Sequence, residues 1–215
     1  TAAKNVTRDV SLVFDFIERP YSPVRFKELL VSPNEMKQKF IRLINEEIKN
    51  KQAGKPAYIL IKINHITDPV MVKKLYEASS HGVRIDLLVR GNCSLITGVL
   101  GVSDTIRING IIDRYLEHSR IFIFANGGDE KMFIGSADWM PRNLDNRVEV
   151  IAPVYDPEIK ADLKRVVEYG LKDTLQGRVV DGTGENRPWI SEDKTAFRSQ
   201  EELYKYYLNE NRIKD

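Results

Sequence analysis

Residues 118–149 gather most of the side chains that could carry chemistry. His118 lies just before one apolar run, and a second apolar run ends at residues 135–138, Gly-Ser-Ala-Asp. The sequence Asn-Gly-Gly-Asp lies between the two runs. This pattern predicts a β-hairpin. Since a hairpin returns its ends to the same place, we expect His118 beside Asp138, where that or a neighbouring carboxylate can orient the imidazole. A lone histidine is more often structural, which is our interpretation of His65 and His81.

Arginine is concentrated in the same part of the chain. Residues 84–147 contain seven arginines and one lysine, together with eight acidic residues. A planar guanidinium matches phosphate oxygens better than an ammonium does. We expect Arg90, Arg120, Arg142 and Arg147 at strand ends or in loops, where they would form an anion site. Ion pairing with the nearby acids is the alternative, because the local charge is balanced.

The surrounding elements predict an α/β fold with a mixed, mostly parallel sheet flanked by helices. Residues 33–89 alternate helix, strand, helix and strand, which is typical of a covered parallel sheet. Ser32 is the expected cap of the first of these helices, and Asp68 opens the second. Arg90 then begins a loop at the carboxyl end of a strand, the usual ligand site of such sheets. Helices are also expected at 7–18, from 157 onward and at 200–208; strands at 25–31, 105–108, 119–124, 131–135 and 146–151; and a loop-rich segment at 171–198.

Composition excludes several classes of protein. The 215 residues carry 33 basic and 31 acidic side chains, a net charge of +2, which argues against a nucleic-acid coat and against an acidic disordered chain. Cys93 is the single cysteine, so intramolecular disulfides and multi-cysteine zinc sites are excluded, and a reducing cytoplasm is expected. We find no metal-ligand spacing, no signal peptide and no transmembrane run. The chain starts without Met, and we expect it to be an excised part of a longer protein.

Two patterns carry a family resemblance. His118-Ser119-Arg120, followed by Gly135-Ser136-Ala137-Asp138, resembles the His-x-Lys and Gly-Ser-x-Asn signature of the phospholipase D superfamily, with arginine for lysine and aspartate for asparagine. The longer pattern LVRGNCSL … RYLEHSRIFIFANGGDEKMFIGSADWMPRNLDNRVEV resembles the last domain of the polyphosphate kinases that make long polyphosphate from ATP. The resemblance runs from about Val6 to the C-terminal helix. It implies that residues 1–215 form a single C-terminal phospholipase-D-like domain, which shares one active site with a preceding domain.

The resemblance also implies site residues. His118 matches the family's second essential histidine, which assists phosphoryl transfer as an acid, a base or an electrostatic partner. Arg90 and Arg147 match arginines that contact the ATP phosphates, with His118 beside them. We take Arg120, Asp138 and Arg142 as supporting candidates. The phosphorylated histidine, the adenine-stacking tyrosine and the residues associated with Mg²⁺ would lie in preceding domains, so no metal ligand is expected here.

The implied activity is reversible transfer of the terminal phosphate of ATP to polyphosphate through a phosphohistidine. The expected partners are ATP, ADP, polyphosphate and the remaining domains of a homo-oligomeric, magnesium-dependent parent, without nucleic acid. We expect the parent in the cytoplasm, with peripheral contact at the inner membrane left open, and the isolated chain without turnover. Two alternatives remain: a phospholipase-D-type phosphodiesterase half-domain completed by dimerisation, and a module that binds polyphosphate or nucleotide without turnover.

Overall fold

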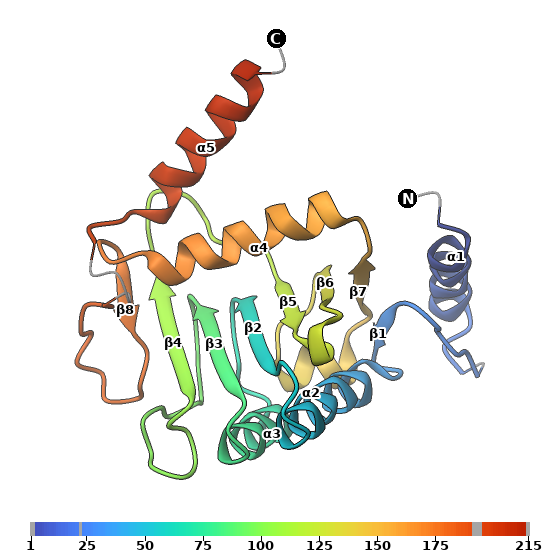
Figure 1. The fold of residues 1–215 in the computed structure, drawn as a ribbon. Coiled ribbons are helices and arrows are strands. Elements are labelled where there is room, and N and C mark those ends of the chain that lie inside the picture. Colours follow the sequence, from blue (N-terminus) through green and yellow to red (C-terminus); the bar gives the residue numbers. More distant parts are fainter. Residues whose placement is uncertain (1–2, 22, 191–194, 214–215) are drawn as a thin grey trace.

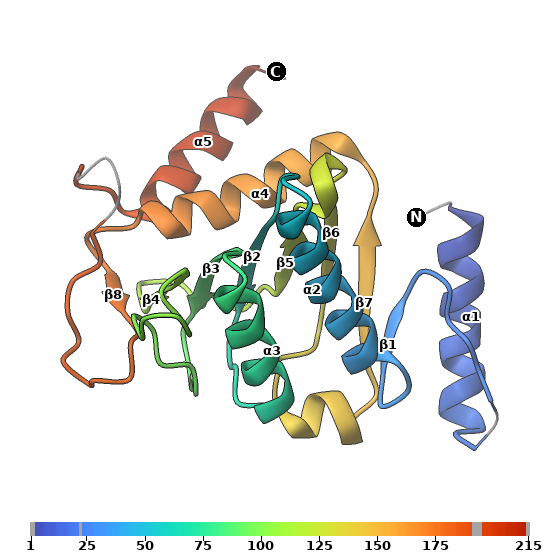
Figure 2. The same cartoon turned by 60° about the horizontal axis from the view of Figure 1, so that its bottom comes forward.

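A single eight-stranded sheet organises the chain in the computed structural model, which describes residues 3–21, 23–190 and 195–213. Helices α2 and α3 cover one face of the sheet and α4 crosses the other, while α1 and β8 lie at opposite ends (Figures 1 and 2). The strand order is β1-β7-β6-β5-β2-β3-β4-β8. The strands are β1 (Leu30–Ser32), β2 (Tyr58–Ile63), β3 (Arg84–Val89), β4 (Ile106–Ile111), β5 (Ile121–Phe124), β6 (Lys131–Gly135), β7 (Glu149–Val154) and β8 (Gly177–Val179). The helices are α1 (Lys4–Glu18), α2 (Met36–Gln52), α3 (Pro69–Ser80), α4 (Pro157–Lys172) and α5 (Ser199–Ile213), with the short turns η1 (Asn126–Gly128) and η2 (Arg142–Asn146).

The sheet is mixed and flanked by helices, which confirms the expected α/β architecture, but it has fewer parallel pairs than expected. Among the named strands of the described chain, parallel pairing is confined to β2–β3 and β3–β4. The remaining strand pairs, on both sides of this central group of three strands, are antiparallel. The reason is connection length: a helical crossover can join parallel strands, whereas the short link between β5 and β6 can only reverse the chain. The expectation of a mostly parallel sheet was therefore wrong.

Apolar side chains fill both faces of the sheet. Those of α2 and α3 pack with alternate residues of the central strands, and those of α4 pack on the opposite face with Leu60, Leu88 and Ile123. A third cluster holds α1 against the β1 end of the sheet through Val13 and Phe16. Helix α5 projects away from the body beyond the end of α4 (Figure 1).

The start of α2 differs from the expected serine cap. Ser32 is the last residue of β1, opposite Glu149 of β7, and its hydroxyl donates to the Asn143 carbonyl at 2.6 Å. The N-cap position is instead Glu35, without a capping side chain. Strand pairing therefore overrode the local capping pattern. Asp68 does cap α3, because its Oδ1 accepts from the backbone N–H groups of residues 70 and 71 at 3.0 Å.

Candidate anion site at the carboxyl edge of the sheet

Strand register brings the candidate residues to one edge. β2 ends before Asn64 and β3 ends before Arg90. β5 runs the other way, with Ile121 opposite Lys62, so Arg120 lies at the same edge. β6 ends there at Gly135, just before Asp138, and β7 begins there, just after Arg147. Fully buried Trp139 anchors the edge: its ring lies 5.1 Å from that of Phe40, and its backbone N–H donates to the His65 carbonyl.

Asp138 is the centre of a hydrogen-bonded network at this edge. It is only 5% exposed, and its carboxylate accepts from Arg120 Nε at 3.1 Å and Nη2 at 3.2 Å. Its Oδ1 also accepts from the backbone N–H and the side-chain amide of Asn64, at 3.0 and 3.1 Å. Asn64 Oδ1 in turn accepts from Arg90 Nε at 2.6 Å. One connected network therefore fixes Arg90 and Arg120 across three strands.

His118 is exposed and contacts Arg120. Arg120 Nη1 lies 3.3 Å from His118 Nδ1 and 3.4 Å from Nε2, and it donates to the His118 carbonyl at 3.1 Å. The expectation that the hairpin ends meet is confirmed by the Arg120–Asp138 pair, but the expected partner was wrong. Asp138 bonds Arg120, and it is Arg120 that meets the imidazole, because the longer side chain spans the gap.

Positive charge surrounds the imidazole. The Arg120 guanidinium lowers the pKa of His118, and burial, Arg90 and Lys62 act in the same direction, while Asp138 opposes them. The neutral imidazole is therefore favoured near neutral pH. The neutral ring then has one N–H donor and one acceptor nitrogen.

Lys62 is a part of the site that sequence reasoning missed. It is the penultimate residue of the apolar strand β2, and its Nζ is 2.9 Å from a carboxylate oxygen of Glu117, the neighbour of His118. Burial lowers the pKa of Lys62, and Glu117 opposes that shift. The single lysine within the run YILIKI could have indicated a buried ion pair, because a charge among apolar strand residues needs a partner.

Helix α5 fixes the loop that carries His118. Gln200 Oε1 accepts from the Tyr115 backbone N–H at 2.9 Å, and Gln200 Nε2 donates to the Tyr115 carbonyl at 2.8 Å and to Glu117 at 2.7 Å. Arg198 adds an ion pair with Asp113 at 2.6 Å. These contacts span more than 80 residues of sequence, so no local pattern could reveal them.

Arg142 and Arg147 stand apart from this network. Both are exposed, on and just after η2, and their side chains make no hydrogen bond or ion pair with another described residue. β7 is four strands from β3 in the sheet order. At about 4.8 Å per strand this puts Arg147 roughly 19 Å from Arg90 along the edge, backbone to backbone. The structure therefore brings Arg90, Arg120, His118 and Asp138 together, and the role of Arg147 stays a prediction.

The other two histidines have backbone partners. His65 Nδ1 accepts from the Asn92 N–H at 2.9 Å, and its ring lies so close to Gly91 that a Cβ there would be 2.3 Å from Cε1. His65 thus shapes the turn that follows Arg90. His81 Nδ1 lies 2.8 Å from the Glu77 carbonyl at the end of α3. Both contacts fit their interpretation as structural residues.

Three carboxylates at this edge have partners within the protein. Asp138 neutralises Arg120, Glu117 pairs with Lys62, and Glu149 accepts hydrogen bonds from Ser136 and Asn143. Within the described ranges, no three His, Cys, Asp or Glu side chains converge to hold a metal ion.

None of the helices that the structure describes is long and apolar enough to span a membrane.

Comparison with known proteins points in one direction. The family model described as polyphosphate kinase C-terminal domain 2 matches residues 29–200. The chain is 44% identical over 206 residues to a polyphosphate kinase of Escherichia coli K12 and 43% identical over 209 residues to one of Vibrio parahaemolyticus. These alignments cover 96% and 97% of this chain but only 30% of each relative.

Solved structures agree with the sequence relatives. The crystal structure of a polyphosphate kinase from Porphyromonas gingivalis matches 99% of this chain with a TM-score of 0.93 and 38% identity, and the match covers 33% of that protein. Nuc from Salmonella typhimurium, a phospholipase D family member, matches 72% of the chain with a TM-score of 0.51 and 15% identity. The second likeness is one of fold alone.

Proposed function

The chain belongs to the polyphosphate kinase family as its C-terminal domain 2, and we propose that its carboxyl edge forms part of an active site that reversibly transfers the terminal phosphate of ATP to polyphosphate. The network from Arg90 through Asn64 and Asp138 to Arg120 and His118 carries this proposal. Phosphoryl transfer depends on positive charge that is already in place when the phosphate reacts. The network supplies such charge and holds it rigidly.

Arg90 and Arg120 take different roles. Asn64 holds only Nε of Arg90, so both Nη groups have no partner within the described residues and are available to phosphate oxygens. Arg120 uses Nε and Nη2 on Asp138 and Nη1 on the His118 carbonyl. We therefore assign phosphate binding to Arg90 and positioning of His118 to Arg120.

His118 would act on the phosphate as a neutral imidazole. The cationic surroundings lower its pKa, and the single N–H of the neutral ring can donate to a phosphate oxygen as charge builds up in the transition state. The other ring nitrogen carries no proton in the neutral form and can accept one. Arg147, supported by Arg142, would contact phosphates farther along the same edge.

The remaining parts of the reaction would come from outside this chain. Because His65 and His81 are bound to backbone groups, we propose that a histidine of a preceding domain attacks the γ-phosphorus of ATP, releases ADP, and then passes the phosphoryl group to the end of a polyphosphate chain. Asp138 and Glu117 are paired with cations, Glu149 is bound by Ser136 and Asn143, and the described residues hold no cluster of three metal-ligating side chains, so the Mg²⁺ that accompanies ATP would be held elsewhere. Residues 1–215 would form one domain of a cytoplasmic homo-oligomer.

Activity measurements with and without the preceding domains test the proposal. We expect the full-length protein to make polyphosphate from ATP and Mg²⁺, and the 215-residue chain to make none. Arg90→Gln in the full-length protein should reduce synthesis strongly. Efficient synthesis by the chain alone would contradict a composite site, and absence of synthesis by the full-length protein would refute the function.

The phosphodiesterase alternative is tested in the same samples. The likeness to Nuc is of fold, and a phosphodiesterase of this type needs two His-x-Lys halves. Hydrolysis of bis(p-nitrophenyl) phosphate by the chain, abolished by His118→Ala, would favour that alternative over kinase chemistry.

A further inference from the structure

A cavity of about 320 Å³ lies between the ends of β3 and β4 and the edge strand β8. Two arginines line it, Arg90 and Arg178, together with the side-chain amides of Gln176 and Asn186. Its other described lining residues are glycines and aliphatic side chains; none of the described residues there is acidic or aromatic. The volume is at the lower end of the range for small-ligand sites.

The two guanidinium groups in this cavity are not neutralised by a described carboxylate. Arg178 uses Nη1 on the carbonyls of residues 177 and 175, at 2.7 and 3.4 Å, which leaves Nε and Nη2 without a partner among the described residues. Arg90 likewise keeps both Nη groups. Elsewhere on the sheet, Arg84 shares Asp86 with a second arginine. Two unpaired cations at one cavity with no acid in its lining favour an anionic ligand.

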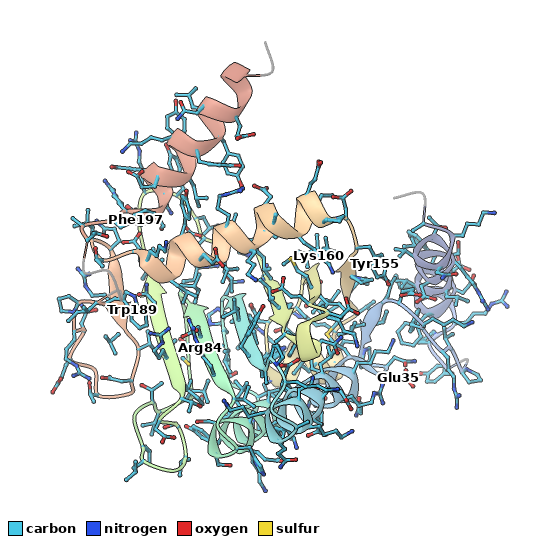
Figure 3. The ribbon with its side chains drawn as sticks, viewed as in Figure 1. Glu35, Arg84, Tyr155, Lys160, Trp189 and Phe197 are labelled. Carbon is cyan, nitrogen blue, oxygen red and sulfur yellow. The ribbon has the colours of Figure 1, made fainter. Side chains whose placement is uncertain are left out.

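The fold holds Arg178 from both sides. β8 pairs with β4, where Gly110 is opposite Arg178. On its other side, the Val179 N–H donates to the Arg187 carbonyl at 2.8 Å and the Trp189 N–H donates to the Gly177 carbonyl at 3.0 Å. The Trp189 ring N–H reaches the Leu171 carbonyl at the end of α4, on the side of the molecule shown at the left of Figure 3. The backbone around Arg178 is therefore held before a ligand arrives, and Nη1 of its side chain is held by the Gly177 carbonyl, which lowers the entropy lost on binding.

We propose that this cavity binds the polyphosphate chain, at phosphate groups beyond those held by Arg90. The inference rests on the proposed function and adds a residue, Arg178, and a direction in which the chain extends. Guanidinium and amide groups suit phosphate oxygens. A nucleotide base would instead favour an aromatic surface, and no aromatic side chain lines the described cavity. Arg90 lines the cavity and belongs to the network with His118, so one anion can reach both.

The experiment measures phosphorylation of ADP by polyphosphate of defined length, using the full-length protein. Arg178→Gln removes the charge and keeps an amide. We expect the KM for long polyphosphate to rise about 10-fold or more, which corresponds to about 1.4 kcal/mol, with kcat and the KM for ADP unchanged. Arg178→Lys should recover part of the loss. Arg25→Gln, at an exposed arginine before β1, is the charge-matched control.

The outcomes separate the inference from the function. An unchanged KM for polyphosphate in Arg178→Gln, with normal turnover, would overturn the subsite and leave the proposed function standing. A rise in the KM for ADP instead would assign the cavity to the nucleotide and also overturn the inference. Lack of ADP phosphorylation by the unmodified protein would refute the function itself. If Arg178→Gln does not fold, Gln176→Ala tests the same subsite. We expect its KM for polyphosphate to rise about threefold, and an unchanged KM would overturn the subsite.

Discussion

Replacing Asp138 by asparagine tests the network at its centre. The substitution keeps the shape of the side chain and removes its charge. If the amide oxygen takes the place of Oδ1, it keeps the bonds from Asn64 and from Arg120 Nε. The new NH₂ group then faces Arg120 Nη2, where Oδ2 accepted a bond at 3.2 Å. Two donors meet at that point, and the guanidinium, whose side chain is 13% exposed, loses its counter-charge.

The expected loss of stability follows from these contacts. One hydrogen bond to a charged group contributes about 1.5–3 kcal/mol. Breaking a fully buried ion pair costs about 3–5 kcal/mol, but Arg120 can turn toward solvent, which reduces the penalty. We expect the free energy of unfolding to fall by about 2–3 kcal/mol, which lowers the thermal midpoint by about 4–12 °C for a chain of this size.

Thermal unfolding of the 215-residue chain, followed by circular dichroism, is the measurement. Asp145→Asn is the matched control, because Asp145 is half-exposed and its partner, Lys37, also pairs with Asp68. Its loss should change the free energy of unfolding by no more than about 1 kcal/mol. A midpoint for Asp138→Asn equal to that of the control would show that the carboxylate does not neutralise Arg120, and the assignment of Arg120 as a positioning residue would fail.

Three further predictions concern the full-length protein. His118→Ala should lower the rate of phosphoryl transfer by about 10²-fold or more with little change in thermal midpoint, while His81→Ala should leave the rate nearly unchanged; near-normal turnover would remove His118 from the mechanism. Arg120→Gln should raise the pKa of His118, because Arg120 is the main cause of its lowered value, and the acid limb of the pH–rate profile should move to higher pH. Asp138→Asn should lower the pKa of His118, because Asp138 raises it in the unmodified protein. An NMR titration in which both variants shift this pKa in the same direction would contradict the charge arrangement. Gln200→Ala should lower kcat by about 10-fold or more with an unchanged KM for ATP, because the His118 loop loses its hold; an unchanged kcat would show that α5 does not position it.

Local patterns predicted the elements that build the site. Apolar runs located β2, β3 and the β5–β6 hairpin within a few residues, and Asp68 was recognised as a helix start. The pattern failed where pairing between distant segments decided the outcome. Ser32 looked like a helix cap but joined a strand opposite Glu149. The segment 171–198 looked like loop, yet β8 forms there because the open edge of β4 accepts it.

The site itself was only partly readable, for the same reason. Arg90, Arg120, His118 and Asp138 could be placed at one edge from the strand order, since each lies next to a predicted strand end. The residues that hold these four in place could not be predicted from the sequence. Asn64 has no distinguishing neighbour in the sequence, and Gln200 acts on a backbone segment 85 residues away. Such residues are selected by position in space, and only the assembled sheet brings them within hydrogen-bond distance.

The different roles proposed for the two arginines explain why a buried acid suits the proposed anion site. An isolated Asp138 would repel phosphate. Its charge is cancelled by Arg120, and Glu117 pairs with the buried Lys62, so Arg90 and the neutral imidazole of His118 remain to meet an anion. The carboxylate of Asp138 thus orders the site without repelling an anion. It holds Asn64, which orients Arg90, and it holds Arg120, which orients His118. Because both arms depend on the same carboxylate, a change at Asp138 should disturb phosphate binding and the position of the histidine together, whereas a change at Arg90 should disturb phosphate binding and leave the contacts that position His118 in place.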